Sequence, residues 1–317
     1  HFKIHIIYVL QYKKGMVKKM DIKTLRYFLA VAQEGTITRA AETLRIAQPP
    51  LSRQMQLLEE ELGVTLFVRG KRSISLTEEG IFLKQQAEEI ISLLEKTQNQ
   101  LGKIKNSTHG TISLGVTETC GASTLPALVD PFHRQYPNIR YNIWCGNGDE
   151  VREKLEKGLV DVGLVREPFN TEPYERIFLK KEAWIALMSV NHPLAAVTTD
   201  TIELGQLTGE PLIIPSRLRL QTEISHWFDQ AAGAQNVLCL YNTLSCLVPL
   251  VENNLGIAIC PESARYYTNP QKLAYRQITR PEHISSLLMV RRRHQVLTAA
   301  TNCFWEFVQD LAESGRL

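Results

Sequence analysis

The chain has 317 residues, enough for two or three domains at about 100–200 residues each. Its composition, with 44% apolar and 22% charged residues, excludes a disordered or fibrous protein, and no apolar run reaches the roughly 18–20 residues of a membrane span. The net charge of +3 is unevenly divided, with 17 Lys and Arg against 11 Asp and Glu in residues 1–107 and 19 against 22 in the rest. A basic N-terminal third predicts contact with a polyanion, although four of its lysines lie within residues 13–19.

Regular hydrophobic patterning begins only after Met20, and Met16 and Met20 are both candidate starts. We interpret residues 1–19 as a leader outside the native product, with an unpacked native arm as the alternative. All six cysteines follow residue 119 without a C-x-x-C pair or a His cluster, so no metal site is predicted. Together with the lack of a secretory signal they favour a cytoplasmic location, and a redox sensor is the alternative role for the thiols.

A first helix is predicted to end at Gly35, a residue suited to a left-handed C-terminal cap. Its inward face is formed by Leu25, Phe28, Leu29 and Ala32. Thr38 is expected to cap a second, short helix. A third helix is expected over residues 48–62, since Pro49 and Pro50 suit a first helical turn. Two short helices joined by a tight turn after a supporting helix predict a helix-turn-helix.

The start of the third helix points polar residues away from its apolar face. They are Gln48, Ser52, Arg53 and Gln56. Such side chains reach base edges and phosphates, and the N-terminal half of a recognition helix is the part that enters the major groove. We therefore predict binding to duplex DNA, with Thr38 as a further contact. The alternative is a solvated helical face that binds nothing.

A β-hairpin "wing" is predicted over residues 64–76, where apolar residues alternate around a basic glycine turn. The side chains of Arg69, Lys71 and Arg72 would lie on the phosphate backbone and position the helix without reading sequence. A solvated turn with no ligand is the alternative.

A long helix is predicted over residues 77–105, capped by Thr77. Its apolar positions are spaced alternately four and three residues apart: Leu83, Ala87, Ile90, Leu94, Thr97, Leu101 and Ile104. This heptad predicts a coiled coil and therefore at least a dimer, which would read paired half-sites. The alternative is an amphipathic helix that lies on its own domain.

Five segments of this region keep the order and spacing of a known family. They are Ala40-Ala41-Glu42-Thr43-Leu44, Ala47-Gln48-Pro49-Pro50-Leu51-Ser52-Arg53-Gln54, Leu57-Leu58-Glu59-Glu60-Glu61-Leu62-Gly63, Leu66-Phe67-Val68-Arg69 and Leu76-Thr77-Glu78-Glu79-Gly80. On these residues the chain closely resembles the LysR-type transcriptional regulators. The match covers the chain from Met20 onward, by motif in the first third and by pattern in the rest.

The resemblance implies an N-terminal all-α winged helix-turn-helix over residues 20–77, a dimerising linker helix over 78–108 and a two-lobed effector-binding domain over 109–317. That last domain would have the fold of type 2 periplasmic binding proteins. The resemblance also implies dimers of dimers on promoter DNA, with RNA polymerase as a candidate partner, and a small-molecule effector that alters DNA bending and transcription. The residues that match the family's DNA-contacting set are Gln48, Pro49, Pro50, Ser52 and Arg53, and its wing is matched by Arg69, Lys71 and Arg72.

Strands and helices alternate over residues 111–311, which predicts an α/β fold with a mostly parallel sheet. Lobe I is expected to hold residues 109–182 and 285–317, and lobe II residues 183–284, with a ligand cleft between them. The expected strands are 111–116, 140–144, 160–165, 183–189, 211–214, 237–241, 257–259 and 287–290.

Ligands of open α/β sheets bind beyond the carboxyl ends of the strands. The polar or small residues found there are Thr119, Cys120, Ser123, Asn147, Gly148, Arg166 and Ser216. Thr119 and Ser123 are expected at a helix N-terminus, and Arg166 would add a positive charge, so we predict a small anionic effector. The alternatives are helix capping by the two hydroxyl residues and an ion pair between Arg166 and Glu167 or Asp161. At Gly148 the chain departs from the family, which usually has Ser or Thr there.

Three classes of protein compete for this sequence. A ligand-responsive DNA-binding regulator explains the charge division, the helix-turn-helix, the heptad and the two lobes together. A cytoplasmic small-molecule-binding protein with no direct DNA role explains only the last two-thirds. No G-x-S-x-G, H-E-x-x-H or P-loop motif is present, so we expect no catalytic residues, no enzyme activity and no cofactor besides the effector.

Overall fold

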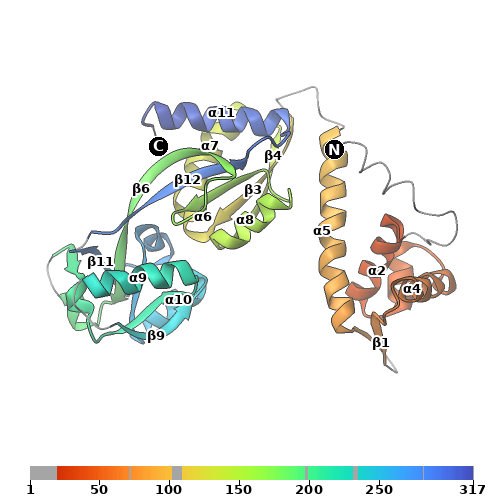
Figure 1. Ribbon diagram of the computed structural model, residues 1–317, viewed down its shortest axis with the longest axis horizontal. Coiled ribbons are helices and arrows are strands. Elements are labelled where there is room, and N and C mark those ends of the chain that lie inside the picture. The colour runs from red at the N-terminus through yellow and green to blue at the C-terminus, as the bar shows by residue number, and fades with distance from the viewer. Residues whose placement is uncertain are drawn as a thin grey trace, which may run out of the picture. The chain divides into compact units, whose positions relative to one another are not determined.

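The structure is a computed structural model that describes residues 20–70, 73–101, 109–196, 199–230, 235–280 and 282–316. The predicted leader, residues 1–19, lies outside this part. The chain divides into two compact units, His1–Thr97 and Gln98–Leu317. Figure 1 shows a helical unit with one small hairpin and a larger α/β unit with two lobes.

The first unit contains the predicted helices and hairpin. Its elements are α2 (Ile22–Glu34), α3 (Ile37–Leu44), α4 (Gln48–Leu62), β1 (Phe67–Arg69), β2 (Ile74–Leu76) and α5 (Glu78–Leu101). Gly35 ends α2 with a φ of 66°, as predicted. The cap of α3 is Thr36 rather than Thr38, because Thr36 is the extended residue directly before the helix and accepts the N–H of Arg39 at 3.3 Å. Thr38 lies exposed within the first turn of α3.

The core of this unit fixes α4 against the other elements. Leu51, Met55 and Leu58 are buried with Phe28 of α2, as the apolar face of α4 predicts. Leu62, expected on the same face, is 38% exposed because it is the last residue of the helix. The three buried residues therefore suffice to set which face of α4 points outward.

The long helix α5 only partly follows the predicted heptad. Leu83 and Ala87 pack into the core of their own unit together with Ile91, which is not a heptad position. The alternative reading, a helix lying on its own domain, thus holds for the first half of α5. Ile90 is 38% exposed, and Phe82 and Leu93 of the same helix are also exposed apolar side chains that the unit leaves uncovered. Residues 102–108, with heptad position 104, lie outside the described residues.

The second unit alternates strands and helices from β3 to α11. Its strands are β3 (Gly110–Thr117), β4 (Ile139–Gly146), β5 (Val162–Arg166), β6 (Tyr174–Ser189), β7 (Thr201–Glu203), β8 (Pro211–Pro215), β9 (Asn236–Tyr241), β10 (Ile257–Pro261), β11 (Leu273–Thr279) and β12 (Ile284–Arg292). Its α-helices are α6 (Glu118–Ser123), α7 (Leu125–Gln135), α8 (Gly148–Glu156), α9 (Leu218–Gln230), α10 (Leu244–Glu252) and α11 (Ala299–Glu313), and its 3-10 helices are η1 (Pro193–Ala196), η2 (Leu204–Leu207) and η3 (Glu262–Tyr267).

The strand β6 connects the two lobes, since it changes partners along its length. It pairs with β12 from Tyr174 to Ala183, and then with β10 and β11 from Trp184 to Ser189. The strand order is β4-β3-β5-β12-β6 in one lobe and β6-β10-β8-β9 in the other, with β11 and β7 added beside β6. Both lobes contain parallel pairs, β3 with β4 and β5, and β8 with β9 and β10.

Three strand segments were not expected from the sequence. The first half of β6 is rich in charged residues, including Lys180, Lys181 and Glu182, which masked its strand pattern. The strands β7 and β11 are short or polar; they pair with each other, and β11 also pairs with β6. Sheet partners that are distant in sequence, rather than local pattern, therefore define these strands.

Candidate DNA interface and effector site

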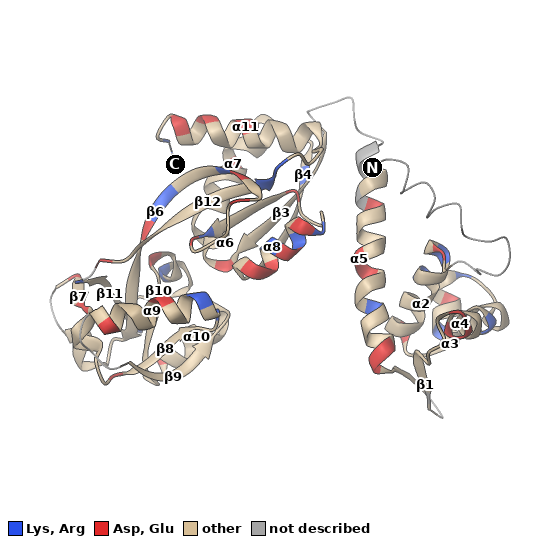
Figure 2. Ribbon diagram, viewed as in Figure 1, with Lys and Arg blue, Asp and Glu red and all other residues tan. Residues whose placement is uncertain are grey.

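The exposed start of α4 carries the predicted base-reading residues. Gln48, Pro49, Pro50, Arg53 and Gln56 are exposed, and Ser52 is half-buried beside them. Among the described residues Arg53 makes no ion pair, so its guanidinium is available to an external acceptor. Figure 2 shows both basic and acidic residues on α2, α3 and α4, and mostly acidic residues on α5.

The hairpin of β1 and β2, which is the predicted wing, is attached directly to α4. One carboxylate oxygen of Glu59, on α4, accepts the backbone N–H groups of Leu66 and Phe67 at 2.7 and 3.1 Å. The N–H of Ile74 donates to the carbonyl of Gly35 at 2.7 Å, and the ring of Phe67 packs on Phe28 at 5.4 Å between centroids. These contacts give α4 and the hairpin a fixed relation, which a winged reader needs.

The basic tip of the wing is only partly described. The backbone of Arg69 ends β1, while its side chain and the whole of Lys71 and Arg72 lie outside the described residues. Their predicted phosphate contacts therefore remain predictions.

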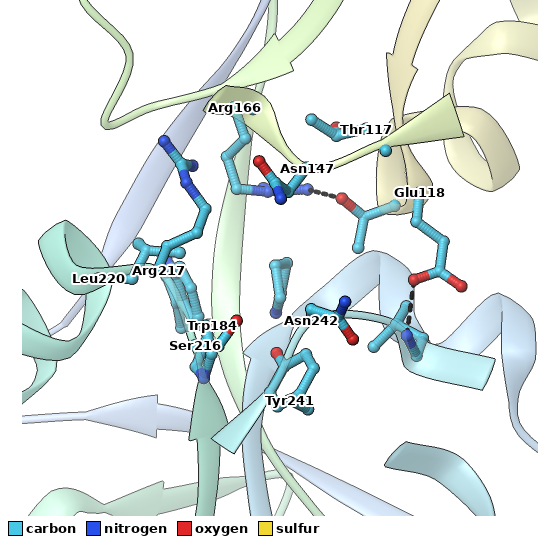
Figure 3. Close-up of a pocket in the computed structure, with 16 residues that line it drawn as sticks. Thr117, Glu118, Asn147, Arg166, Trp184, Ser216, Arg217, Leu220, Tyr241 and Asn242 are labelled. Carbon is cyan, nitrogen blue, oxygen red and sulfur yellow. Dashed lines mark hydrogen bonds between the residues drawn. The ribbon is translucent and has the colours of Figure 1, made fainter. Parts of the chain in front are cut away.

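The effector unit has a cavity of about 100 Å³ between its two lobes, shown in Figure 3. The lining residues lie at or just beyond the carboxyl ends of β3, β4 and β5 in one lobe and of β8, β9 and β10 in the other, together with Trp184 of β6. Of the predicted effector residues, Thr119, Asn147, Gly148, Arg166 and Ser216 line the cavity. The sequence did not single out the rest of the lining, which is Thr117, Glu118, Gly146, Trp184, Pro215, Arg217, Leu220, Tyr241, Asn242, Leu244 and Pro261.

Cys120 and Ser123 do not lie on the cavity. Cys120 is buried in the core beside α7, and burial raises the pKa of its thiol. The helix α6 has only six residues, so Ser123 stands at its C-terminal end, where its hydroxyl donates to the carbonyl of Thr119 at 2.9 Å. Burial also raises the pKa of the Cys145 and Cys260 thiols. None of these three cysteines has the lowered pKa that a redox sensor needs.

Arg166, the last residue of β5, is buried at 6% exposure and already paired. Its guanidinium forms an ion pair with Glu182 of β6. It also donates to the hydroxyls of Ser285, Ser263 and Thr119 at 3.1, 3.2 and 3.4 Å. An internal carboxylate therefore neutralises the charge that had suggested an anionic effector.

The expected neighbours of Arg166 in the sequence are not its ion-pair partners. Asp161 instead accepts the N–H of Ser113 at 3.0 Å, and the N–H of Glu167 donates to the carbonyl of Ser286. The true partner, Glu182, lies in the half of β6 that the sequence pattern did not reveal. In the sheet β12 lies between β5 and β6, so this ion pair crosses an intervening strand and cannot be inferred from the sequence without the strand order.

A second arginine spans the cleft at the start of α8. Arg217, which follows β8, donates to both carboxylate oxygens of Asp149 at 3.0 and 3.2 Å. This hydrogen-bonded ion pair lowers the pKa of Asp149 below its ordinary value of 3.8. A Cβ at Gly148 would lie 3.0 Å from the guanidinium of Arg217. The glycine thus leaves room for Arg217 where the family usually places a hydroxyl.

The other polar lining residues are held by their own elements. Asn147 caps α8, because its side-chain oxygen accepts the N–H groups of Asp149 and Glu150 at 2.9 and 3.1 Å. The hydroxyl of Tyr241 donates to the carbonyl of Ile259 at 3.2 Å, and burial raises its pKa well above the usual range. The backbone N–H of Ser216 donates to the carbonyl of Tyr241 at 2.7 Å. These contacts hold the polar groups of the cavity wall in place among apolar lining residues such as Trp184, Leu220 and Leu244.

The described residues include no cluster of three or more His, Cys, Asp or Glu that could hold a metal ion. In the same residues, every helix is too short or too polar to cross a bilayer.

Comparison with known proteins gives matches to both units. Residues 22–81 match the family described as bacterial regulatory helix-turn-helix protein, lysR family, and residues 105–313 match the LysR substrate binding domain. The HTH-type transcriptional regulator BenM of Acinetobacter baylyi is 30% identical over 249 residues, which cover 78% of this chain and 82% of that protein. The Hca operon transcriptional activator HcaR of Escherichia coli is 28% identical and covers 88% and 94%.

Solved structures show the same fold. The structure of CbnR, a LysR family transcriptional regulator, aligns with a TM-score of 0.74 at 23% identity and covers 92% of this chain and 99% of that one. Full-length BenM aligns with a TM-score of 0.55 at 28% identity and covers 93% and 98%. These matches agree with the predicted fold class, a winged helix-turn-helix joined to a two-lobed effector domain.

Proposed function

Since this chain belongs to the LysR family of DNA-binding transcriptional regulators, we propose that the start of α4 reads promoter DNA and that a small molecule in the interlobe cavity controls this binding. The observation that carries the DNA role is the exposed polar start of α4, held rigidly by a buried core and by the Glu59 contact to the wing. The alternative of a small-molecule-binding protein with no DNA role is not favoured, because it does not explain the N-terminal helix-turn-helix unit.

The side chains on α4 divide by chemistry. Arg53 has the fork of donors that pairs with guanine, and Gln48 and Gln56 have the amides that pair with adenine. Ser52 would contact either base. Pro49 and Pro50 would bring the start of α4 close to the DNA backbone. The wing arginines and lysine, residues 69, 71 and 72, would contact phosphates and supply affinity without sequence preference. Exposed Thr38 on α3 is a further candidate contact.

Self-association through α5 is part of the proposal. Phe82, Ile90 and Leu93 are 65%, 38% and 43% exposed, and their spacing puts them on one face of the helix. A second copy covering this face would bury apolar surface and give a symmetric pair of reading helices. We propose a dimer formed by α5 that assembles further into a dimer of dimers, with RNA polymerase as a candidate partner at the promoter. Such a DNA-bound assembly would work in the cytoplasm.

We also propose that the effector is a small acid, for a reason that differs from the sequence-based one. Arg166 is neutralised, but α8, α9 and α10 all begin at the cavity, where Asn147, Ser216 and Leu244 line it. Helix N-termini direct backbone N–H groups and a partial positive charge at this space. Thr119, Gly148 and the edge of Trp184 would complete the site. No catalytic step and no cofactor belong to this function.

A duplex-selection experiment tests the proposal. The full chain is used to select duplexes from a random pool, and the binding of the selected duplex is measured by fluorescence anisotropy between 50 and 200 mM salt. We expect specific binding that weakens by about 10³–10⁵ over this range if six to ten phosphates are contacted, with a scrambled duplex as control. No duplex affinity even at the lowest salt would contradict the proposed function.

A further inference from the structure

The helix α10 is capped by a carboxylate from the opposite lobe. Its own cap residue, Thr243, makes no side-chain hydrogen bond to the helix. Instead Glu118 on α6 accepts the backbone N–H groups of Leu244 and Ser245 at 2.6 and 3.4 Å, the first of which is drawn in Figure 3. The carboxylate of Glu118 thus occupies the position that an anion would take at this helix start.

The surroundings of Glu118 have further polar capacity. The backbone carbonyl of Glu118 accepts the hydroxyl of Tyr267 at 2.8 Å, so its main chain is tied to η3. Next to it Thr117 is buried at 9% exposure and lines the same cavity, yet its hydroxyl oxygen has no hydrogen-bond partner among the described residues. The Nε of Arg166, on a side chain buried to 6%, likewise has no acceptor there. These two groups give the cavity hydrogen-bonding capacity that the described residues do not use.

Three positive groups of the cavity each already have a carboxylate of the chain itself. Arg166 has Glu182, Arg217 has Asp149, and the start of α10 has Glu118. The first two carboxylates face guanidinium groups, and removing Glu182 would leave a buried charge unpaired. Glu118 is only partly buried and faces backbone N–H groups. Moving the Glu118 carboxylate away therefore costs less free energy than moving that of Glu182 or Asp149, provided that another acceptor takes over the N–H groups of α10.

We propose that Glu118 is a built-in ligand of the α10 N-terminus, and that the carboxylate of an acidic effector takes its place there. The exchange keeps the N–H groups of Leu244 and Ser245 bonded while it removes the link between α6 and α10. Binding of the effector would thereby be coupled to the relative position of the two lobes. This inference rests on the proposed effector function of the cavity and names the chemistry and regulation of that site.

Acetate is the probe for this site, because it is the carboxylate that Glu118→Ala removes. The full chain is compared as wild type, Glu118→Ala and the surface control Glu153→Ala, in which the lost carboxylate lies on α8 and pairs with Lys157 directly after that helix. Thermal unfolding is followed with increasing sodium acetate, against acetamide plus sodium chloride at equal ionic strength. We expect Glu118→Ala to unfold at lower temperature, and acetate to restore most of this loss with a saturable dose dependence.

The wild type and Glu153→Ala should respond to acetate no more than to the control solutes, with an apparent affinity at least about tenfold weaker than that of Glu118→Ala. If Glu118→Ala impairs folding, Glu118→Gln replaces it, because glutamine keeps the side-chain volume. Acetate should also stabilise Glu118→Gln, because a neutral amide interacts less favourably with the N-terminus of a helix than a carboxylate does. The inference is overturned if acetate stabilises neither variant beyond the control solutes, or stabilises the wild type equally. This readout involves no DNA, so its failure with intact duplex binding would leave the proposed function standing.

Discussion

Replacing Arg166 with methionine should destabilise the effector unit strongly, because it breaks a buried ion pair. The side chains of Arg166 and Glu182 are 7% and 5% exposed. Removing one partner of such a pair typically costs about 3–5 kcal/mol, since the other charge stays buried without compensation. The hydroxyls of Ser263 and Ser285 would lose their hydrogen bonds to the guanidinium as well. For a unit of this size the cost corresponds to a fall in Tm of about 6–20 °C.

A double-mutant cycle measures the free energy of interaction between Arg166 and Glu182. The thermal unfolding of the wild type is compared with Arg166→Met, Glu182→Leu and the double variant, in the full chain and at neutral pH. Because the double variant buries no lone charge, we expect it to be more stable than either single variant, with a coupling energy of about 2 kcal/mol or more. Additive single effects, or a loss below about 1 kcal/mol for Arg166→Met, would refute the reasoning.

Two further predictions concern stability. Gly80→Ala should destabilise the first unit by about 1–3 kcal/mol although alanine favours helices, because its Cβ would lie 2.2 Å from the carbonyl oxygen of Leu66; an unchanged Tm would contradict this. Asp149→Asn should lower the Tm of the effector unit by a constant amount above about pH 5. Because Arg217 lowers the pKa of Asp149 below 3.8, that difference should shrink as the pH falls through this lowered pKa, and a difference that grows in acid would be inconsistent with the ion pair.

The helix-turn-helix and wing of the first unit were predictable from the sequence because the patterns that define them are local. The Gly35 cap, the prolines at the start of α4 and the alternation around the wing each depend on neighbouring residues. The cap predicted at Thr38 lies two residues after the true cap, Thr36, in a segment with two threonines. The heptad did not reveal that Leu83 and Ala87 pack on the core of their own unit, because a spacing rule contains no tertiary contacts.

The effector site was less predictable because its chemistry depends on pairings across the fold. The rule that ligands lie beyond strand ends located Asn147, Arg166 and Ser216 on the cavity wall. It could not show that Glu182 neutralises Arg166 from a strand with a charged pattern. Glu118 was passed over since nothing in its local sequence reveals that it reaches α10 in the other lobe. An acidic residue directly after a strand, next to a predicted anion site, is the signal that could have marked it.

The central claim, that α4 reads bases while the wing contacts phosphates, is tested most directly by comparing Arg53→Ala with Arg72→Ala on a panel of single-base variants of the selected duplex. Binding is measured by fluorescence anisotropy at several salt concentrations. Arg53→Ala should lose about 1–3 kcal/mol on the selected duplex and relax the preference at one position, whereas Arg72→Ala should weaken all duplexes evenly and lower the salt slope by about 1. Equal losses for both variants on every duplex would contradict base reading by α4.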